Sequence, residues 1–352
     1  MAAEVFLYFL RLGATVFGGV GPQLLAMRRD LVDGRRWVTP AEFDRGVALA
    51  YLCPGPVGTQ AGVYMGWRRA GALGSFAALT GFLLVPFLLV VALAAARAHY
   101  GSGGWFGKVV LGMRSAVVPV IALSAARLFR TALTSRVEKA VSIAALAWCV
   151  LRPEDATAAV LAAGALLAFR ASRGTGERGA ASAGLLALFL VGLQAGALVY
   201  GTGQAILPIV REAAVVRRSW LSDAQFADAV SAGLVTPGPI VMAIAYVGFV
   251  AAGFGGAFAA AAGAFVPGWL LVLLVGPWME RLERDPRLKA FARGATAAAI
   301  GAVGAAAVAL AGTTLGSPAG AAIAAASTAA ILLGAPDAAV IAACGAAAAL
   351  FL

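Results

Sequence analysis

The sequence contains an internal repeat, whose two copies are separated by a constant number of residues. Sliding the chain by 183 positions superposes Pro54-Gly55-Pro56 on Pro237-Gly238-Pro239. The same shift, without a gap, also pairs Trp37 with Trp220, Phe43 with Phe226, Phe17-Gly18 with Tyr200-Gly201, Leu24 with Leu207 and Phe82 with Phe265. One register that joins so many distinctive residues is not coincidence. The chain must therefore fold as two related halves.

The two halves cannot form a water-soluble protein. Of the 352 residues, 62% are hydrophobic and only 12% are charged, whereas a soluble domain carries about 25% charged residues. Many apolar stretches approach or exceed the roughly 20 residues that a membrane-spanning helix needs. The fold class that we predict is an all-α polytopic membrane protein with two homologous repeats, a multi-pass protein of the inner (plasma) membrane.

Apolar segments occur in the same order in both halves, about 5–6 in each. Residues 1–170 form the predicted first repeat, residues 171–182 a polar linker, and residues 183–352 the second repeat. The segments lie near 4–27, 41–66, 70–98, 108–130, 138–151 and 155–170, and near 183–211, 224–248, 251–278, 290–312, 317–334 and 336–352. The short pair 138–151 and 155–170 is read either as thin spans or as one re-entrant hairpin. The N-terminal stretch lacks the features of a cleavable signal and is predicted to be the first membrane helix.

Positive charge supports a membrane location rather than a nucleic-acid partner. The net charge is +11, but Lys and Arg stand in short clusters between apolar segments, as on cytoplasmic loops. In the second half the loops after the first and third segments carry the arginines, which predicts that both are cytoplasmic. The first half carries positive charge on both sides and gives no orientation. We favour inverted halves because transporters are commonly built this way.

Helix starts repeat as well. Thr39-Pro40-Ala41-Glu42 combines an N-cap hydroxyl, a proline at the first helical position and an acid at the third. Ser222-Asp223-Ala224-Gln225 is its counterpart in the second half. Both are capping boxes. They predict helices that begin at about residues 40 and 223.

Glycine–proline clusters interrupt the first two segments of each half. Proline in a helix interior costs about 3 kcal/mol, and two prolines around a glycine stop a helix. Irregular backbone at membrane depth survives only where protein buries it or where it lines a cavity. A helix that restarts there points free amides and a positive dipole end into the gap, which favours an anion. A single cluster could be a packing kink, but two matching pairs favour a site near the midplane.

Several donors are needed to hold a doubly charged anion. One helix end contributes about 0.3–2 kcal/mol and one hydrogen bond to a charged group about 1.5–3 kcal/mol, far less than such an ion loses on leaving water. Polar side chains stand beside each break as additional donors. The predicted substrate site consists of Arg11, Gly18, Gly19, Gly21, Pro22, Gln23, Pro54, Gly55, Pro56, Gly58, Thr59, Gln60, Gly201, Thr202, Gly203, Gln204, Thr236, Pro237, Gly238 and Pro239.

Few charges lie within the apolar segments. Arg11 is expected to attract the anion, with snorkelling to a surface as the alternative. For Arg114 the two interpretations stay open. The acids that could carry a coupling proton are Glu4, Glu42, Asp44 and Asp228, of which Glu42 and Asp44 are better explained by the helix start. Cys53, beside a break, is read as a packing residue.

The remaining reactive side chains do not support an enzyme. Three cysteines and one histidine, His99, lie far apart in the chain, with no metal-ligand or disulfide spacing. No paired acids or activated nucleophile stand together. We expect no catalytic residues, no metal and no cofactor.

The motifs at the breaks resemble those of the chromate ion transporter family, in its long form with two halves. The first half carries FGGVGPQLLAMRRDLV, a W-x5-F spacing and LCPGPVGTQAGVYMGWRRAGALG, and the second half carries YGTGQAILPIVREAAV, W-x5-F, GLVTPGPI and AFVPGW. The resemblance covers much of residues 6–86 and 198–269. It implies a secondary transporter that moves chromate, with sulfate as a competing analogue, by two halves of opposite topology.

Chromate efflux, which would give chromate resistance, is the preferred function. Uptake of sulfate or another oxyanion is the alternative, and a passive anion channel is the third. Chromate and sulfate share charge and shape, so the residues do not separate them. A donor cage without an acceptor would suit such a fully deprotonated dianion. A coupling proton and a homodimer are both compatible with the sequence, and the lipid bilayer is the expected surroundings.

Overall fold

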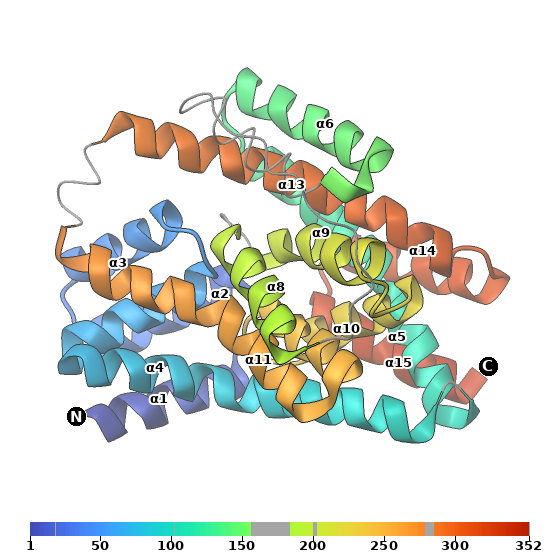
Figure 1. Ribbon diagram of the computed structural model, residues 1–352, viewed down its shortest axis with the longest axis horizontal. Helices are drawn as coiled ribbons and strands as arrows, with labels where there is room; N and C mark the ends of the chain where they lie inside the picture. Colours follow the sequence, from blue (N-terminus) through green and yellow to red (C-terminus); the bar gives the residue numbers. More distant parts are fainter. Residues whose placement is uncertain (18, 102, 156–183, 200–202, 279–284, 352) are drawn as a thin grey trace.

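The computed structural model describes residues 1–17, 19–101, 103–155, 184–199, 203–278 and 285–351. Its regular elements are all helical within these ranges (Figure 1). Four helices are long and apolar enough to cross a membrane: Val57–Tyr100, Gly104–Thr131, Ile240–Trp278 and Lys289–Gly312. The protein is therefore a multi-pass membrane protein, as predicted. The predicted linker 171–182 and the segment 155–170 lie outside the described ranges, apart from Asp155.

The first segment reverses direction where the sequence predicts a break. Helix α1 (Ala2–Thr15) ends before Gly19, and α2 (Val20–Met27) continues into a π-helical stretch, η1 (Arg28–Gly34). Arg35, just beyond η1, lies 3.7 Å from Glu4 at the start of α1. The chain has thus returned to the end of the molecule at which it started, so the first segment is a re-entrant hairpin.

The second segment forms another hairpin. Helix α3 (Pro40–Leu52) begins at the predicted capping box, with the Thr39 hydroxyl accepting from the Glu42 amide and the Glu42 carboxylate accepting from the Thr39 amide. After the break at residues 53–56, α4 (Val57–Tyr100) begins. Arg68 of α4 pairs with Glu42 at the start of α3, so this chain too returns to its starting end.

Helix α4 is really two helices. Ala70 and Gly71 have non-helical backbone angles, and Gly71 has φ +62°. Gly66 and Gly74, on either side of this turn, touch backbone to backbone. Residues from 72 to 100 then cross the whole length of the molecule, alongside α1 (Figure 1). The separation predicted between segments 41–66 and 70–98 is confirmed at this turn.

The second half has the same plan. Helix α8 (Leu185–Ala197) leads into its break, followed by η3 (Gly203–Ala205), α9 (Ile206–Arg211) and η4 (Glu212–Arg217). Helix α10 (Asp223–Val235) begins at the predicted Ser222–Gln225 capping box. Beyond the second break lie η5 (Ile240–Met242) and α11 (Ala243–Val275), which ends in η6 (Gly276–Trp278). Helix α11 turns at Ala252-Gly253, and Gly248 and Gly256 touch as their counterparts do.

The register of the repeat changes after the breaks. Gly13 packs against the backbone of Phe82, and Gly196 packs in the same way against Ala264. The turns at Ala70-Gly71 and Ala252-Gly253 show the same spacing, one residue shorter than before the breaks. Phe82 therefore corresponds to Ala264, and its pairing with Phe265 in the ungapped sequence register is wrong.

The two long helices run antiparallel. The indole nitrogen of Trp269 donates to the Ser75 hydroxyl at 2.9 Å, and the rings of Phe87 and Phe254 lie 5.8 Å apart. We call the end that holds Glu4, Glu42 and the Ala70-Gly71 turn the proximal end, and the opposite end, with Tyr100 and the Ala252-Gly253 turn, the distal end. The arginine-bearing loop before α10 is distal, whereas η6 is proximal. The prediction that the loops after the first and third segments share one side is wrong, because the re-entrant hairpins reverse the chain within the molecule.

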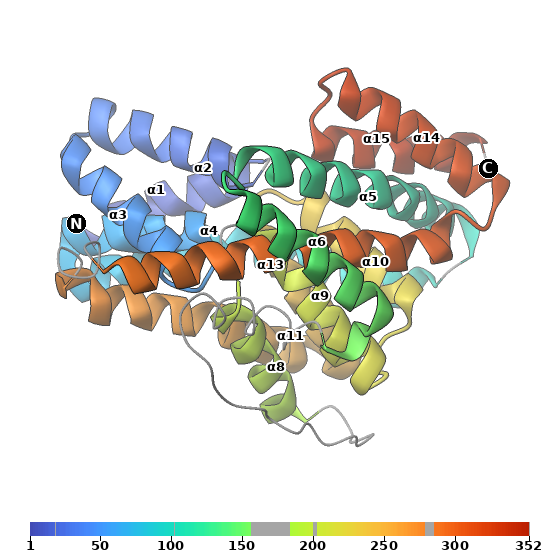
Figure 2. The ribbon, with the colours of Figure 1, turned by 90° about the horizontal axis from the view of Figure 1, so that it is seen from above.

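The remaining helices enclose these hairpins. They are α5 (Gly104–Thr131), α6 (Arg136–Leu151), η2 (Pro153–Asp155), α13 (Pro286–Thr314), α14 (Pro318–Leu332) and α15 (Asp337–Phe351). Helices α14 and α15 form a short hairpin against α5 (Figure 2), with Ser327 and Cys344 3.2 Å apart. Its tip points back toward the breaks.

Candidate functional site

The breaks of the two halves are joined by a reciprocal pair of hydrogen bonds. The amide of Gly55 donates to the carbonyl of Val199 at 2.7 Å, and the amide of Gly238 donates to the carbonyl of Val16 at 3.0 Å. The two bonds are related by the 183-residue shift of the repeat. Each proline–glycine–proline break therefore binds the first break of the opposite half, and all four breaks meet inside the molecule.

The central glycines of these breaks have no room for a side chain. Gly55 has φ +135° and Gly238 has φ +91°, values that L-residues rarely adopt. A Cβ atom on Gly55 would collide with the Gln60 side chain, and one on Gly238 with the ring of Pro86. These positions need glycine for both backbone conformation and packing.

A cavity of about 370 Å³ lies where the breaks meet. At about 30 Å³ per water it has room for roughly twelve waters, so an oxyanion inside it would keep part of its hydration. Ten of the predicted site residues line it: Gly19, Gly21, Gln23, Pro56, Gly58, Gly203, Gln204, Thr236, Gly238 and Pro239. The structure thus brings half of the residues of the sequence-based site to one cavity.

Helix starts form much of the cavity wall. Helix α2 begins after Gly19 and α4 after Pro56, and neither has a side-chain cap. The first amides of each helix have no acceptor within the helix. Val20, Gly21, Val57 and Gly58, from these first turns, line the cavity. They bring positive dipole ends to an uncharged part of the wall.

The polar side chains divide into those that face the cavity and those that brace the breaks. Gln23 lines the cavity; it is 2% exposed, and its Nε2 atom has no hydrogen-bond partner among the described residues. Thr236 also lines it, but its hydroxyl donates to the Ala232 carbonyl at 2.8 Å. The side-chain amide of Gln60 donates to the Pro54 carbonyl at 2.5 Å and so stabilises the break that precedes α4. Thr59 is buried and does not line the cavity.

Other predicted residues lie elsewhere. Arg11 is exposed on α1, Pro22 is exposed on α2, and neither lines the cavity. Pro54, Gly55 and Pro237 shape the breaks from behind the cavity wall. Gly18, Gly201 and Thr202 fall outside the described residues.

Sequence reasoning missed the charged part of the wall. Arg127 and Ser124 of α5, Tyr51 of α3 and Asp337 at the start of α15 all line the cavity. Arg127 lies 3.8 Å from Asp337 and donates to the Ile331 carbonyl at 3.4 Å. No motif marks Arg127 or Asp337 in the sequence. The expectation of a cage without an acceptor is wrong, because the Asp337 carboxylate is one.

Among the described residues, no group of three or more His, Cys, Asp or Glu side chains could hold a metal ion. The polar lining of the cavity comprises the amides of two helix starts, the side chains of Gln23 and Gln204, hydroxyl groups, the Arg127 guanidinium and the Asp337 carboxylate.

Known proteins are similar to this chain over most of its length. A family model described as chromate transporter matches residues 3–169 and 186–350. The chain is 35% identical over 331 residues to a chromate transport protein of Cupriavidus metallidurans, covering 88% of this chain and 82% of that one. It is 36% identical over 327 residues to a probable chromate transport protein of Synechococcus elongatus (86% and 83% covered). It is 30% identical over 339 residues to a chromate transport protein of Pseudomonas aeruginosa (88% and 81% covered). The search of solved structures found no significant match. The chain therefore belongs to the chromate transporter family.

Proposed function

We propose that this protein is a secondary transporter of a tetrahedral dianion, chromate in the first place with sulfate as its analogue. The observation that carries the proposal is the reciprocal hydrogen bonding of Gly55 to Val199 and of Gly238 to Val16, which closes one cavity between the four breaks. The names of three relatives as chromate transport proteins support the substrate.

The mechanism that we propose is alternating access between two inverted halves. The antiparallel course of residues 72–100 and of the second part of α11 supports inversion, as do the matching hairpins. A cavity formed by both halves opens to one side when one half moves against the other. The anion would be held by the amides of α2 and α4, by Gln23 and by Arg127.

The direction that we propose is efflux across the inner membrane. A membrane potential that is negative inside favours the exit of a dianion by about 4.6 kcal/mol for two charges across 100 mV. A proton gradient is then not required, although a coupled proton would change the balance. Uptake of sulfate or another oxyanion is the rival function.

The decisive experiment is flux of labelled chromate and sulfate in inside-out vesicles, with and without a potential or a pH gradient. Efflux predicts uptake into these vesicles that follows the potential. Accumulation against the anion gradient separates a transporter from a channel. Absence of oxyanion flux under all conditions would remove the assignment.

The breaks can be tested with a matched pair of glycine variants. Gly55→Ala and Gly238→Ala place a Cβ into the crowded packing of the breaks, so we expect flux to fall by more than tenfold (about 1.4 kcal/mol), a larger loss than that of expression. Gly71→Ala is the control, because Gly71 also has positive φ (+62°) but has nothing within 4 Å of the added Cβ. Equal losses in all three variants would show that backbone strain, and not the cavity, determines flux.

A further inference from the structure

A second cavity lies beside the first, toward the proximal end. It has a volume of about 580 Å³. We call it the vestibule. Its walls come from the end of α3, from the α5–α6 connection, and from the first turns of α13, which begins at the same end as the N-terminus (Figure 1). It therefore combines elements of both halves.

We call the first cavity, which lies where the four breaks meet, the break cavity. The vestibule and the break cavity share two wall residues, Tyr51 and Leu128. Tyr51 lies two residues before the break at Cys53, and its side chain is accessible rather than packed in the core. Helix α5 runs along both spaces, with Arg127 in the break cavity and Thr131, one turn later, in the vestibule. The two cavities are thus neighbouring compartments on one line toward the proximal end.

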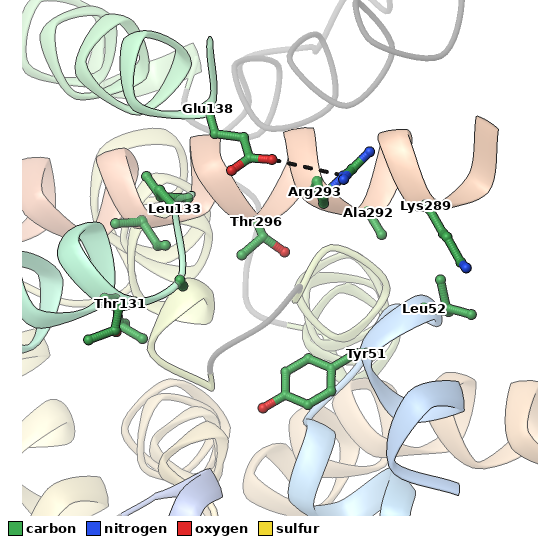
Figure 3. Close-up of a pocket in the computed structure, with 12 residues that line it drawn as sticks. Tyr51, Leu52, Thr131, Leu133, Glu138, Lys289, Ala292, Arg293 and Thr296 are labelled. Carbon is green, nitrogen blue, oxygen red and sulfur yellow. Dashed lines mark ion pairs between the residues drawn. The ribbon is translucent and has the colours of Figure 1, made fainter. Parts of the chain in front are cut away.

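The charged side chains of the vestibule favour an anion. Lys289 and Arg293 lie one turn apart on α13, and both line the space. Figure 3 shows Lys289 and Thr296 on the side of α13 that faces Leu52 and Tyr51, whereas Arg293 turns toward Glu138. The Arg293–Glu138 distance is 3.9 Å. Lys289 makes no ion pair with any described residue, and Glu138, whose carboxylate lines the vestibule, pairs with Arg293 instead.

We propose that the vestibule is the route by which the oxyanion passes between the break cavity and the proximal surface, with Tyr51 as the gate and Lys289 as the residue that attracts the ion. This inference rests on the proposed transport function. The half-two counterpart of Tyr51 is Leu234, which also lines the break cavity. Tyr51, the proposed gate toward the proximal end, therefore has a phenol hydroxyl that Leu234, its counterpart in the second half, lacks.

The route can be tested by thiol labelling of Thr296→Cys. An anionic methanethiosulfonate reagent should label Cys at this position faster than a cationic one of similar size, and sulfate should slow the reaction. Adding Lys289→Gln should reduce the preference for the anionic reagent. Ala298→Cys is the control, because Ala298 is fully buried on another face of α13 and should stay unlabelled. Labelling is read by peptide mass spectrometry, so the three native cysteines do not interfere.

Flux measurements complete the test. Labelling of Thr296→Cys should block chromate flux, and Lys289→Glu should raise the half-saturating concentration several-fold. Lys108→Glu, an equivalent change on an exposed lysine near the distal end, should leave it unchanged. Full flux after complete labelling at position 296, or equal rates with the two reagents, would overturn the route. Failure of the proposed transport function would give a different result. The unmodified protein would then transport no oxyanion, although labelling at position 296 would still depend on the charge of the reagent.

Discussion

Gln23 is the residue at which the contribution of a side chain to oxyanion binding can best be distinguished from its contribution to the stability of the fold. It is almost fully buried at the cavity wall, and its Nε2 atom has no partner in the part of the chain that the structure describes. A buried donor without a partner costs about 1–3 kcal/mol of stability. Such a cost is retained when the donor serves a ligand.

We therefore expect opposite effects on binding and stability from Gln23→Leu. Loss of a hydrogen bond to a charged group, about 1.5–3 kcal/mol, corresponds to roughly 10- to 150-fold weaker oxyanion binding. The melting temperature in detergent should stay the same or rise, because no internal hydrogen bond of the Nε2 atom is lost. Half-saturation of flux and thermal unfolding measure the two quantities. A parallel loss of both would mean that Gln23 supports the fold instead of the substrate.

At the scale of elements, the capping boxes at the starts of α3 and α10 differ in whether they contain a titratable group. Both helices start with a capping box, but the third helical residue is Glu42 in the first half and the uncharged Gln225 in the second. The backbone amide of Thr39, together with Arg68, holds the pKa of Glu42 below its ordinary value, against the opposing effect of partial burial. An acid with a lowered folded-state pKa stabilises the fold above its unfolded pKa, and this contribution is lost as the pH falls through the folded value.

The Thr39 amide, which donates to Glu42, should therefore lose protection in acid, whereas the Ser222 amide, which donates to the uncharged Gln225, should not. Hydrogen-exchange protection factors of the first turns of both helices, compared between neutral pH and pH below the lowered pKa of Glu42, provide the measurement. Glu42→Gln should make α3 behave like α10. If both helices lost protection together, the cause would lie in the fold as a whole.

The sequence predicted the capping boxes, the breaks and part of the cavity wall, because each depends on local chemistry at Thr39, Pro54, Gly55 and their repeats. It did not predict that the chain turns back at the breaks. An apolar run has the same composition whether the second helix continues across the membrane or returns. For the same reason it gave the wrong sides for the loops, and it could not bring Arg127, Asp337 and Tyr51 to the cavity, since they come from three separate helices.

At the scale of the whole molecule, the distal end is held by a buried ion pair between the halves. Arg97, near the end of α4, donates from Nε to Asp228 of α10 at 3.1 Å, and the Asp228 side chain is only 3% exposed. The positive charge of Arg114 also attracts Asp228. This pair closes the end opposite to the vestibule.

Breaking this pair from one side should destabilise the protein strongly. Asp228→Asn or Arg97→Gln alone should cost about 3–5 kcal/mol, because each leaves a charge or a polar group buried without its partner. The double variant should cost less than the sum of the two. A double-mutant cycle on thermal unfolding in detergent measures the coupling. Additive losses would show that the two side chains act independently.

The crosswise bonds of Gly55 and Gly238 have a consequence for assembly. Neither half contains both partners of either bond: each offers one amide and one carbonyl that only the other half can complete. An isolated half would expose both groups at membrane depth, where an unpaired backbone group costs several kcal/mol. Completion of the cavity between the breaks should therefore wait until the second half has been inserted beside the first.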